Sequence, residues 1–355
     1  MALLTEPNLS GRGKREDLAD MIALVDARDT PFVSMARKGS KPGNMYFRWQ
    51  ADQNPQPVVG GTIDGTDVST YSNYVTGYRK ELANYAQIFR RTVRVSKLAQ
   101  DLADVAGVRD SLSDNVAKAI VGLKRDMEVT FTSNQLGQQD TGAGGVPYLS
   151  AGAQSWIGGD DIGTGLNIGG SPTAPDFQTP STSRVTGANA SALTDTVVQG
   201  VLKSIFDQTG QYKSFDCIVG TDLKRAFTNL LGTTALTTTV STTTAVSKVQ
   251  TFQRDAGADT FIQSMDVFQG DFGTVRLHPT TFIGTISGTP PVYTAKSAYG
   301  LVLDMNLIEV RYGGNVAQVT ALPDFGGGPA RLIEAVAGLV VGNPLGLGKF
   351  TYTAA

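Results

Sequence analysis

The stretch from Ser111 to Asn134 constrains the fold most, because its apolar residues recur at the spacing of a single helix face. These residues follow one another at steps of 4, 4, 3, 4 and 4 positions: Leu112, Val116, Ile120, Leu123, Met127 and Phe131. Such a helix is about 36 Å long, whereas the mean globular helix has about 11–12 residues. We predict a spine helix over residues 111–135, with Leu123 and Met127 under a sheet formed by the last strands of the chain.

The ends and the polar side of this helix carry further signals. Ser111 and Asp114 resemble a capping box, and Asn134 and Gly137 are typical of a helix stop. Two pairs of opposite charge lie four residues apart on the side expected to face water: Asp114 with Lys118, and Lys124 with Glu128. An ordinary core helix would show the same features. These signals therefore predict where the helix begins and ends, but not its role.

Charge and polarity narrow the classes of partner. Of 355 residues, 30 are Lys or Arg and 32 are Asp or Glu, and the charged fraction of 17% is below the usual quarter. The nearest approach to a basic patch is Arg90, Arg91 and Arg94 beside Lys97, which a strand with exposed arginines explains equally well. A nucleic-acid groove is therefore not indicated, and the polar, Gly-rich composition favours broad contact with other protein.

The sequence contains few residues of the types that catalysis and metal binding require. Cys217 and His278 are the single residues of their types, which excludes an intrachain disulfide and a Cys/His zinc site. Cys217 lies in a buried-strand pattern and is predicted to be a core residue. Residues 163–169 have one position too many for a dinucleotide-binding loop. We predict no catalytic residues, no cofactor and no metal, and hence no enzyme.

Membrane insertion and secretion are not indicated either. No apolar run reaches 18 residues, and the first residues lack a basic start followed by an apolar core. We expect no membrane partner and synthesis in a reducing compartment.

Two strand patterns separated by a long polar segment predict a projecting hairpin. Residues 45–50 and 74–95 are rich in aromatic and β-branched residues, and residues 54–73 between them show turn residues and no periodicity. A loop of that length is usually functional or mobile. A plain surface hairpin is the alternative explanation of the pattern.

The second half of the chain predicts an α+β fold. Residues 150–192 are irregular and rich in Gly, Ser and Thr, and helix patterns at 194–210 and 221–231 flank a strand at 215–219. Strand patterns follow at 248–253, 260–268, 274–277, 280–285, 300–303, 308–312, 316–322 and 331–341. One cluster of helices with mostly antiparallel sheet is typical of α+β proteins.

Short motifs accompany these elements in a fixed order along the chain. They are REDLAD at 15–20, DTPF at 29–32, YFRWQAD at 46–52, NYAQIF at 84–89, VS at 95–96, GVP at 145–147 and NP at 343–344. Together with the element order, they resemble the major capsid proteins of tailed bacteriophages with the HK97-type fold. The insertion at 150–192 and the Thr-rich segment 233–244 have no counterpart in that pattern.

This resemblance implies a division of the chain into five segments. They are an N-terminal arm (1–44), an extended β-hairpin loop (45–95), a peripheral domain with the spine helix and the insertion (96–192), an axial domain (193–300), and a return to the peripheral domain with the C-terminus (301–355).

The resemblance also implies a function and partners. Proteins of this kind assemble into hexamers and pentamers of an icosahedral shell that encloses double-stranded DNA, touched non-specifically at most. Scaffold, portal and decoration proteins are expected partners, the virion is the expected location, and the host bacterial cytoplasm is the place of synthesis. Another phage structural protein, such as a tail or fibre component, is the alternative.

The projecting hairpin is the segment expected to contact a neighbouring subunit. Its loop has too little apolar content to fold alone, yet it is held between two aromatic-rich strands. The residues expected to make inter-subunit contacts are Trp49, Arg79, Lys80, Arg90 and Arg91. Their contacts would contribute little if exposed and more if desolvated.

Overall fold

The computed structural model describes most of the chain from residue 29 onward. The described residues are 29–54, 57, 59–61, 63–65, 67, 78–101, 110–142, 145–158, 162–163, 166, 177–230, 264–288, 291–314, 316–324 and 326–353. The motif at 15–20, most of the loop at 54–73, the Thr-rich segment and the strand expected at 248–253 lie outside the described residues.

The long helix forms as predicted and is α3 (Ser111–Thr132). Its residues Leu123, Met127 and Phe131 have no exposed surface. Val116 and Ile120, nearer its start, are partly buried and pack against the same core. The apolar period therefore identified the buried face of the helix correctly, and the burial deepens toward its C-terminal half.

The N-terminal cap of α3 differs from the prediction. Asp110, one residue before the helix, is the cap: its Oδ1 accepts hydrogen bonds from the backbone amides of Leu112 at 3.0 Å and Ser113 at 3.2 Å. The expected capping box of Ser111 with Asp114 is wrong, because Ser111 is already inside the first turn. An Asp side chain reaches the free amides as well as a Ser does, and it also faces the positive end of the helix dipole.

One of the two expected charge pairs on α3 forms. Lys118 Nζ lies 2.6 Å from Asp114 Oδ2, as predicted. The pair of Lys124 with Glu128 is wrong, because Glu128 has no exposed surface. The helix ends at Thr132, three residues before the predicted end at 135, and the residue that follows, Ser133, is in extended conformation.

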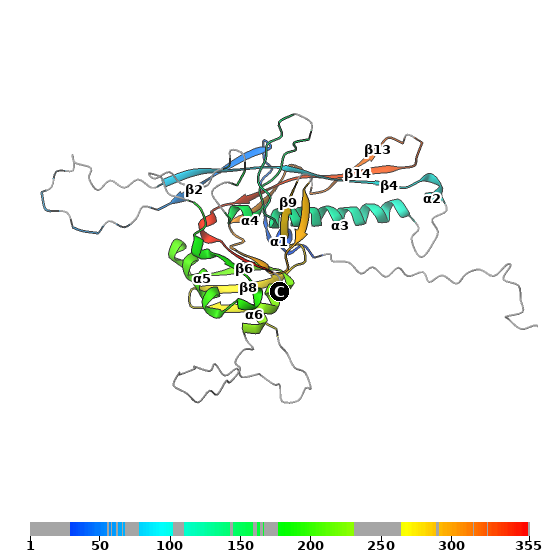
Figure 1. Cartoon of the computed structure of the whole chain (residues 1–355). Helices are drawn as coiled ribbons and strands as arrows, with labels where there is room; N and C mark the ends of the chain where they lie inside the picture. Colours follow the sequence, from blue (N-terminus) through cyan, green and yellow to red (C-terminus); the bar gives the residue numbers. More distant parts are fainter. Residues whose placement is uncertain are drawn as a thin grey trace, which may run out of the picture.

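A five-stranded sheet lies along α3, as Figure 1 shows. Its strands run in the order β1 (Arg37–Lys38), β12 (Ile308–Tyr312), β14 (Ala330–Val341) and β13 (Gln318–Leu322), and β4 (Gln87–Arg94) also pairs with β14. Alternate residues of β14, Ile333, Ala335 and Ala337, are buried in the same core as Leu123 and Met127. The expected packing of the helix under the last strands is confirmed.

The expected hairpin consists of β2 (Tyr46–Gln53) and β3 (Tyr78–Tyr85), which pair antiparallel over eight residues. Figure 1 shows this hairpin extending away from the body on the side opposite to the start of α3. The single return strand expected over 74–95 is two strands. After Ala86 the chain continues as β4, whose partner is β14 and not β2. Periodicity within one strand pattern carries no information on which partner each half will choose.

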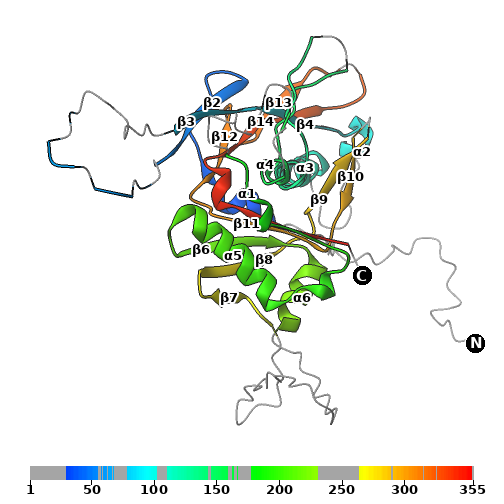
Figure 2. The same ribbon diagram turned by 60° about the vertical axis from the view of Figure 1, so that its left-hand side comes forward.

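A second lobe lies below α3 in Figures 1 and 2. It contains a six-stranded sheet in the order β5 (Arg184–Gly187), β15 (Gly348–Tyr352), β11 (Tyr299–Leu303), β6 (Lys213–Val219), β8 (Gly273–Pro279) and β7 (Val267–Gly270). Two helices pack on it, α5 (Asp195–Thr209) and α6 (Thr221–Leu230). The expected helix–strand–helix unit is present, and Cys217 is buried in β6 as predicted.

The two faces of this sheet belong to different cores. Phe215, Cys217 and Val219 of β6 pack with α5 and α6 in a core of the lower lobe. Ile218, between Cys217 and Val219 in the strand, belongs instead to the main core that also contains the buried residues of α3, since successive strand residues point to opposite faces. The six-stranded sheet therefore lies between the two cores and contributes one face to each.

Smaller elements complete the described part of the chain. They are α1 (Pro31–Met35), α2 (Lys97–Asp101), α4 (Ala153–Trp156), the hairpin of β9 (Gly284–Ser287) and β10 (Val292–Ala295), and the 3-10 turns Ser181–Ser183, Ala190–Ala192 and Pro344–Gly346.

Candidate functional site: the hairpin and its anchors

The hairpin is stiffened along its length by charge pairs between its own strands. Arg79 and Asp52 are direct register partners, and their side chains meet at 3.1 Å. Arg48 and Glu81 meet diagonally at 2.8 Å. All four side chains are about half exposed or more, so each pair contributes less than about 1 kcal/mol. These ion pairs hold the four side chains in place on the surface of the hairpin but add little to its stability.

Aromatic side chains attach the base of the hairpin to the body. Trp49 Nε1 donates a hydrogen bond to the Val341 carbonyl at 3.0 Å. Its ring lies 5.4 Å from the ring of Trp156 and 6.0 Å from that of Phe47. Phe47 in turn sits against Gly338 of β14, where a Cβ would come within 2.6 Å of its ring. The hairpin leaves the body from a rigid, largely apolar base.

A buried amide, Asn84, fixes the point where β3 leaves the hairpin for the body. It has no exposed surface. Its Nδ2 donates to the carbonyl of Leu339 at 2.7 Å, and its Oδ1 accepts from the amides of Tyr85 at 2.8 Å and Ala151 at 2.9 Å. One side chain thus joins the hairpin, the last long strand and the segment after α3. Sequence reasoning placed Asn84 in a motif but gave no sign of this role.

The basic residues expected at subunit contacts have partners within the chain. Arg90 pairs with Glu334 at 2.6 Å, and Arg91 pairs with Asp126 of α3 at 2.6 Å. Both arginines belong to β4, so they lie on the body sheet and not on the hairpin. Their side chains are still 58% and 45% exposed, which leaves room for further partners. Their inter-subunit role stays a prediction.

Arg79, Lys80 and Trp49 are the expected contact residues that lie on the hairpin itself. The Arg79 side chain is 64% exposed beside Asp52. Trp49 is partly buried among aromatic rings of its own chain. Whether these three residues touch another subunit stays a prediction as well.

The short helix α1 is held by a carboxylate from α3. Glu128 Oε1 accepts from the Phe32 amide at 2.9 Å and Oε2 accepts from the Val33 amide at 2.8 Å. Thr30, which precedes α1, makes no side-chain cap. Glu128 therefore satisfies the free amides at the start of α1 from another element. Burial raises the pKa of Glu128 to about 7, although the two amide bonds act in the opposite direction.

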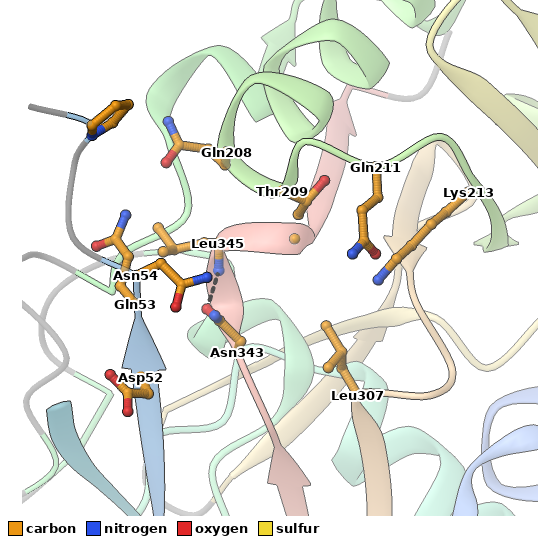
Figure 3. A pocket seen from close by; sticks show the side chains of 12 residues that line it. Asp52, Gln53, Asn54, Gln208, Thr209, Gln211, Lys213, Leu307, Asn343 and Leu345 are labelled. Carbon is orange, nitrogen blue, oxygen red and sulfur yellow. Dashed lines mark hydrogen bonds between the residues drawn. The ribbon is translucent and has the colours of Figure 1, made fainter. Parts of the chain in front are cut away.

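A cavity of about 430 Å³ lies where the end of the hairpin meets the lower lobe. Figure 3 shows Gln53, Asn54, Gln208 and Gln211 around it, with Asn343 and Leu345 at its wall. Carboxamides carry both donors and acceptors, so this lining can bond an extended polypeptide backbone. It is formed by segments that are far apart in the sequence, so no local pattern could have revealed it.

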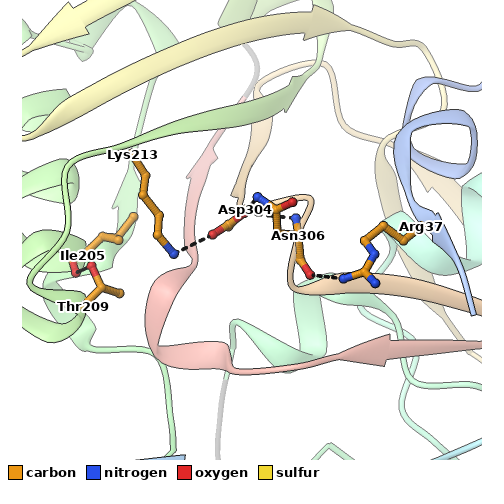
Figure 4. A network of polar contacts seen from close by, with 6 residues as sticks. All are labelled: Arg37, Ile205, Thr209, Lys213, Asp304 and Asn306. Atoms are coloured by element: carbon orange, nitrogen blue, oxygen red, sulfur yellow. Dashed lines mark hydrogen bonds and ion pairs between the residues drawn. The ribbon is translucent and has the colours of Figure 1, made fainter.

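A polar network beside the cavity ties the N-terminal region to both lobes, as Figure 4 shows. Lys213 Nζ lies 3.0 Å from Asp304 Oδ2, and Asp304 Oδ1 accepts from the Asn306 amide at 3.0 Å. Arg37 of β1 donates to the Asn306 carbonyl at 3.1 Å. Asp304 is buried, so its single ammonium partner and the turn amide are needed to compensate its charge.

The single histidine and the single cysteine, which were considered for catalysis, have ordinary structural contacts within the fold. His278 Nε2 lies 2.9 Å from Asp216 Oδ1, and Arg276 Nε lies 2.9 Å from the same oxygen. Burial raises the pKa of the Cys217 thiol, with a smaller contribution from Asp216. Within the described residues, no group of three His, Cys, Asp or Glu side chains could hold a metal ion. Among the helices of that same part, none is long and apolar enough to cross a bilayer.

A spine helix under one sheet, a projecting hairpin and a second α+β lobe define the HK97-type capsid fold. Solved structures share it over nearly the whole chain. The capsid asymmetric unit of cyanophage A-1(L) aligns with a TM-score of 0.63 and 13% identity, over 98% of both chains. The capsid of cyanophage P-SCSP1u aligns at 0.60 and 10%, over 99% of this chain and 97% of that one. The mature capsid of bacteriophage PhiM1 aligns at 0.57 and 11%, over 99% and 97%.

The sequence itself gives the family. The family model for the SU10 major capsid protein matches residues 5–354, and the chain belongs to this family. The major capsid protein of Escherichia phage Phieco32 is 32% identical over 132 residues. That alignment covers 35% of this chain and 34% of the relative, so the chain matches about a third of the length of that protein.

Proposed function

We propose that this chain is the major capsid protein of a tailed phage. It assembles into hexamers and pentamers of an icosahedral shell that encloses double-stranded DNA. The observation that carries the proposal is the match over nearly the full chain to subunits of phage capsids, together with membership of a major capsid family. The same matches support a shell protein over a tail or fibre component.

The strand pairing supports a peripheral and an axial domain. The peripheral domain comprises α3, the five-stranded sheet and the hairpin that leaves it. The axial domain comprises the six-stranded sheet with α5 and α6. In this division β5 and β15 join the axial sheet, although they lie outside residues 193–300, and β11 crosses the boundary at residue 300. The chain thus passes between the two domains more often than a linear division allows.

The hairpin serves to bridge subunits in this proposal. Its base is rigid, its strand β3 carries Arg79 and Lys80 on opposite faces, and its strands reach beyond the body (Figure 1). Arg90 and Arg91 add exposed charge on the body sheet, where an approaching hairpin could lie. A closed rotational arrangement of such contacts gives rings, and rings tiled on a surface give a shell.

Scaffold, portal and decoration proteins are the partners that such a shell would have, and packaged DNA would be touched without sequence specificity. The chain would be made in the host bacterial cytoplasm and reside in the virion. With a net charge of −2 it presents no general attraction for a polyanion.

Deleting residues 56–72 and joining the strands by a short Gly turn tests the bridging role. Gln53 and Tyr78 are the last paired residues of the hairpin, so the deletion leaves its ladder intact. We expect a folded protein that melts near the parent temperature and forms no closed particles in electron microscopy. A matched variant replaces the same residues with an equal length of Gly and Ser, which separates the loop's sequence from its length.

The possible outcomes distinguish the two levels of the proposal. Normal particles from the deletion variant would refute subunit bridging by this loop. A parent chain that stays monomeric at every concentration and salt tested, with and without scaffold, would refute the capsid function itself.

A further inference from the structure

Two basic side chains lie next to each other at one edge of the six-stranded sheet. Arg184 of β5 and Lys349 of β15 are register partners in a parallel pairing, so their side chains emerge on the same face. Phe350, the next residue of β15, points into the core formed with α5 and α6. Arg184 and Lys349 therefore lie on the opposite face, at the side of the sheet where β5 is the edge strand.

The heads of both side chains gather at the backbone of Gly158. Arg184 donates from its guanidinium to the Gly158 carbonyl at 2.6 Å. Lys349 Nζ is so close to the same residue that a Cβ on Gly158 would lie 3.1 Å from it. Both residues are only partly exposed. The carbonyl holds the guanidinium in place but cannot neutralise two charges.

Neither cation has a carboxylate partner among the residues that the structure describes. Arg184 Nε is buried without a hydrogen-bond acceptor there. Burial, and then the positive charge of Arg184, lower the pKa of Lys349. Lys213, at the start of β6 in the same sheet, shows the usual arrangement, because its ammonium meets Asp304. The pair at Gly158 is thus a half-buried positive site without an anion in the described part of the chain.

We propose that Arg184 and Lys349 bind one carboxylate side chain from a second copy of this chain. The inference rests on the proposed function, which brings copies side by side. β5 is an edge strand and both cations keep some exposed surface. The hydroxyls of Thr186 and Thr351, 3.0 Å apart, are the next pair on the same face. Two adjacent cations are enough to bind one carboxylate, whereas a nucleic acid binds through many phosphate contacts. We therefore assign the site to a single carboxylate.

Replacing Lys349 with methionine tests the site. The variant removes a half-buried charge without a partner, so the unassembled protein should melt at or above the parent temperature. Its yield of particles should fall by about tenfold, since a charge-assisted contact is lost in the assembled state only. Lys349→Arg should restore assembly. Lys203→Met, at an exposed lysine paired with Asp207, is the matched control and should assemble like the parent.

Acetylation of lysines followed by mass spectrometry gives a second readout. A carboxylate partner raises the pKa of an amine, so Lys349 should react about tenfold more slowly in particles than in unassembled protein. Lys203 should show little change.

Three results would overturn the proposal. They are parent-like assembly of Lys349→Met, equal reactivity of Lys349 in both states, and protection that occurs only in DNA-filled particles. The last result would assign the site to phosphate. A parent chain that forms no particles would instead refute the proposed function. Comparing the parent with the variant therefore distinguishes failure of this site from failure of the function.

Discussion

Replacing Glu128 with glutamine should change how stability depends on pH. Glu128 is buried between α3 and α1, where it accepts from two backbone amides and pairs with no cation among the residues that the structure describes. Burial raises its pKa from 4.5 to about 7. The folded protein therefore keeps this proton over a range in which the unfolded chain has released it. The stabilisation is complete below pH 4.5 and is lost as the pH rises through 7.

The size of this effect follows from the shift. A shift from 4.5 to about 7 corresponds to about 3 kcal/mol of unfolding free energy, lost between these two pH values. Glutamine does not titrate and keeps one acceptor for the amides of Phe32 and Val33. It should cost about 1 kcal/mol at pH 5 for the lost hydrogen bond. By pH 8 the variant should be as stable as the parent or more so.

Urea unfolding of the unassembled protein at pH 5, 6, 7 and 8 measures this difference directly. Lys124→Ala, at an exposed position of the same helix, is the matched control and should stay within about 0.5 kcal/mol of the parent at every pH. A parent-minus-variant difference that is the same at pH 5 and pH 8 would show that Glu128 does not hold a proton in the folded state. Hydrogen exchange at Phe32 and Val33 reports separately whether α1 stays attached.

Two further substitutions probe the anchors of the hairpin and the spine. Leu123→Asp places an unpaired charge beneath the sheet, so it should cost several kcal/mol and give insoluble or unassembled protein, whereas Leu98→Asp, at a side chain 69% exposed, should not. Normal assembly of Leu123→Asp would show that this seam is not a core. Asn84→Ala leaves the Leu339 carbonyl and two amides unpaired and should cost about 3 kcal/mol or more, measured by urea unfolding. A loss below about 1 kcal/mol would mean that water replaces the amide.

Local patterns predicted the elements of this fold well. The spacing of apolar residues identified α3 and its buried face, because helix periodicity depends on neighbours within two turns. The same holds for α5, whose end at Gly210 in the left-handed conformation matches the expected stop. Asp114 and Lys118 pair as expected, since both lie on one exposed helix surface. Each of these features depends on residues a few positions apart.

Local patterns could not predict contacts between residues that are distant in the sequence. The spacing of Lys124 and Glu128 indicated a surface pair, but the amides that Glu128 binds lie 95 and 96 residues away. The expected return strand divides at Ala86, because its second half, Gln87–Arg94, pairs with the distant strand Ala330–Val341. The cation pair of Arg184 and Lys349 arises in the same way, from the parallel pairing of two edge segments. Periodicity within the chain predicts which apolar residues are buried, whereas the packing of distant segments decides which polar groups are buried with them and what each of these groups meets.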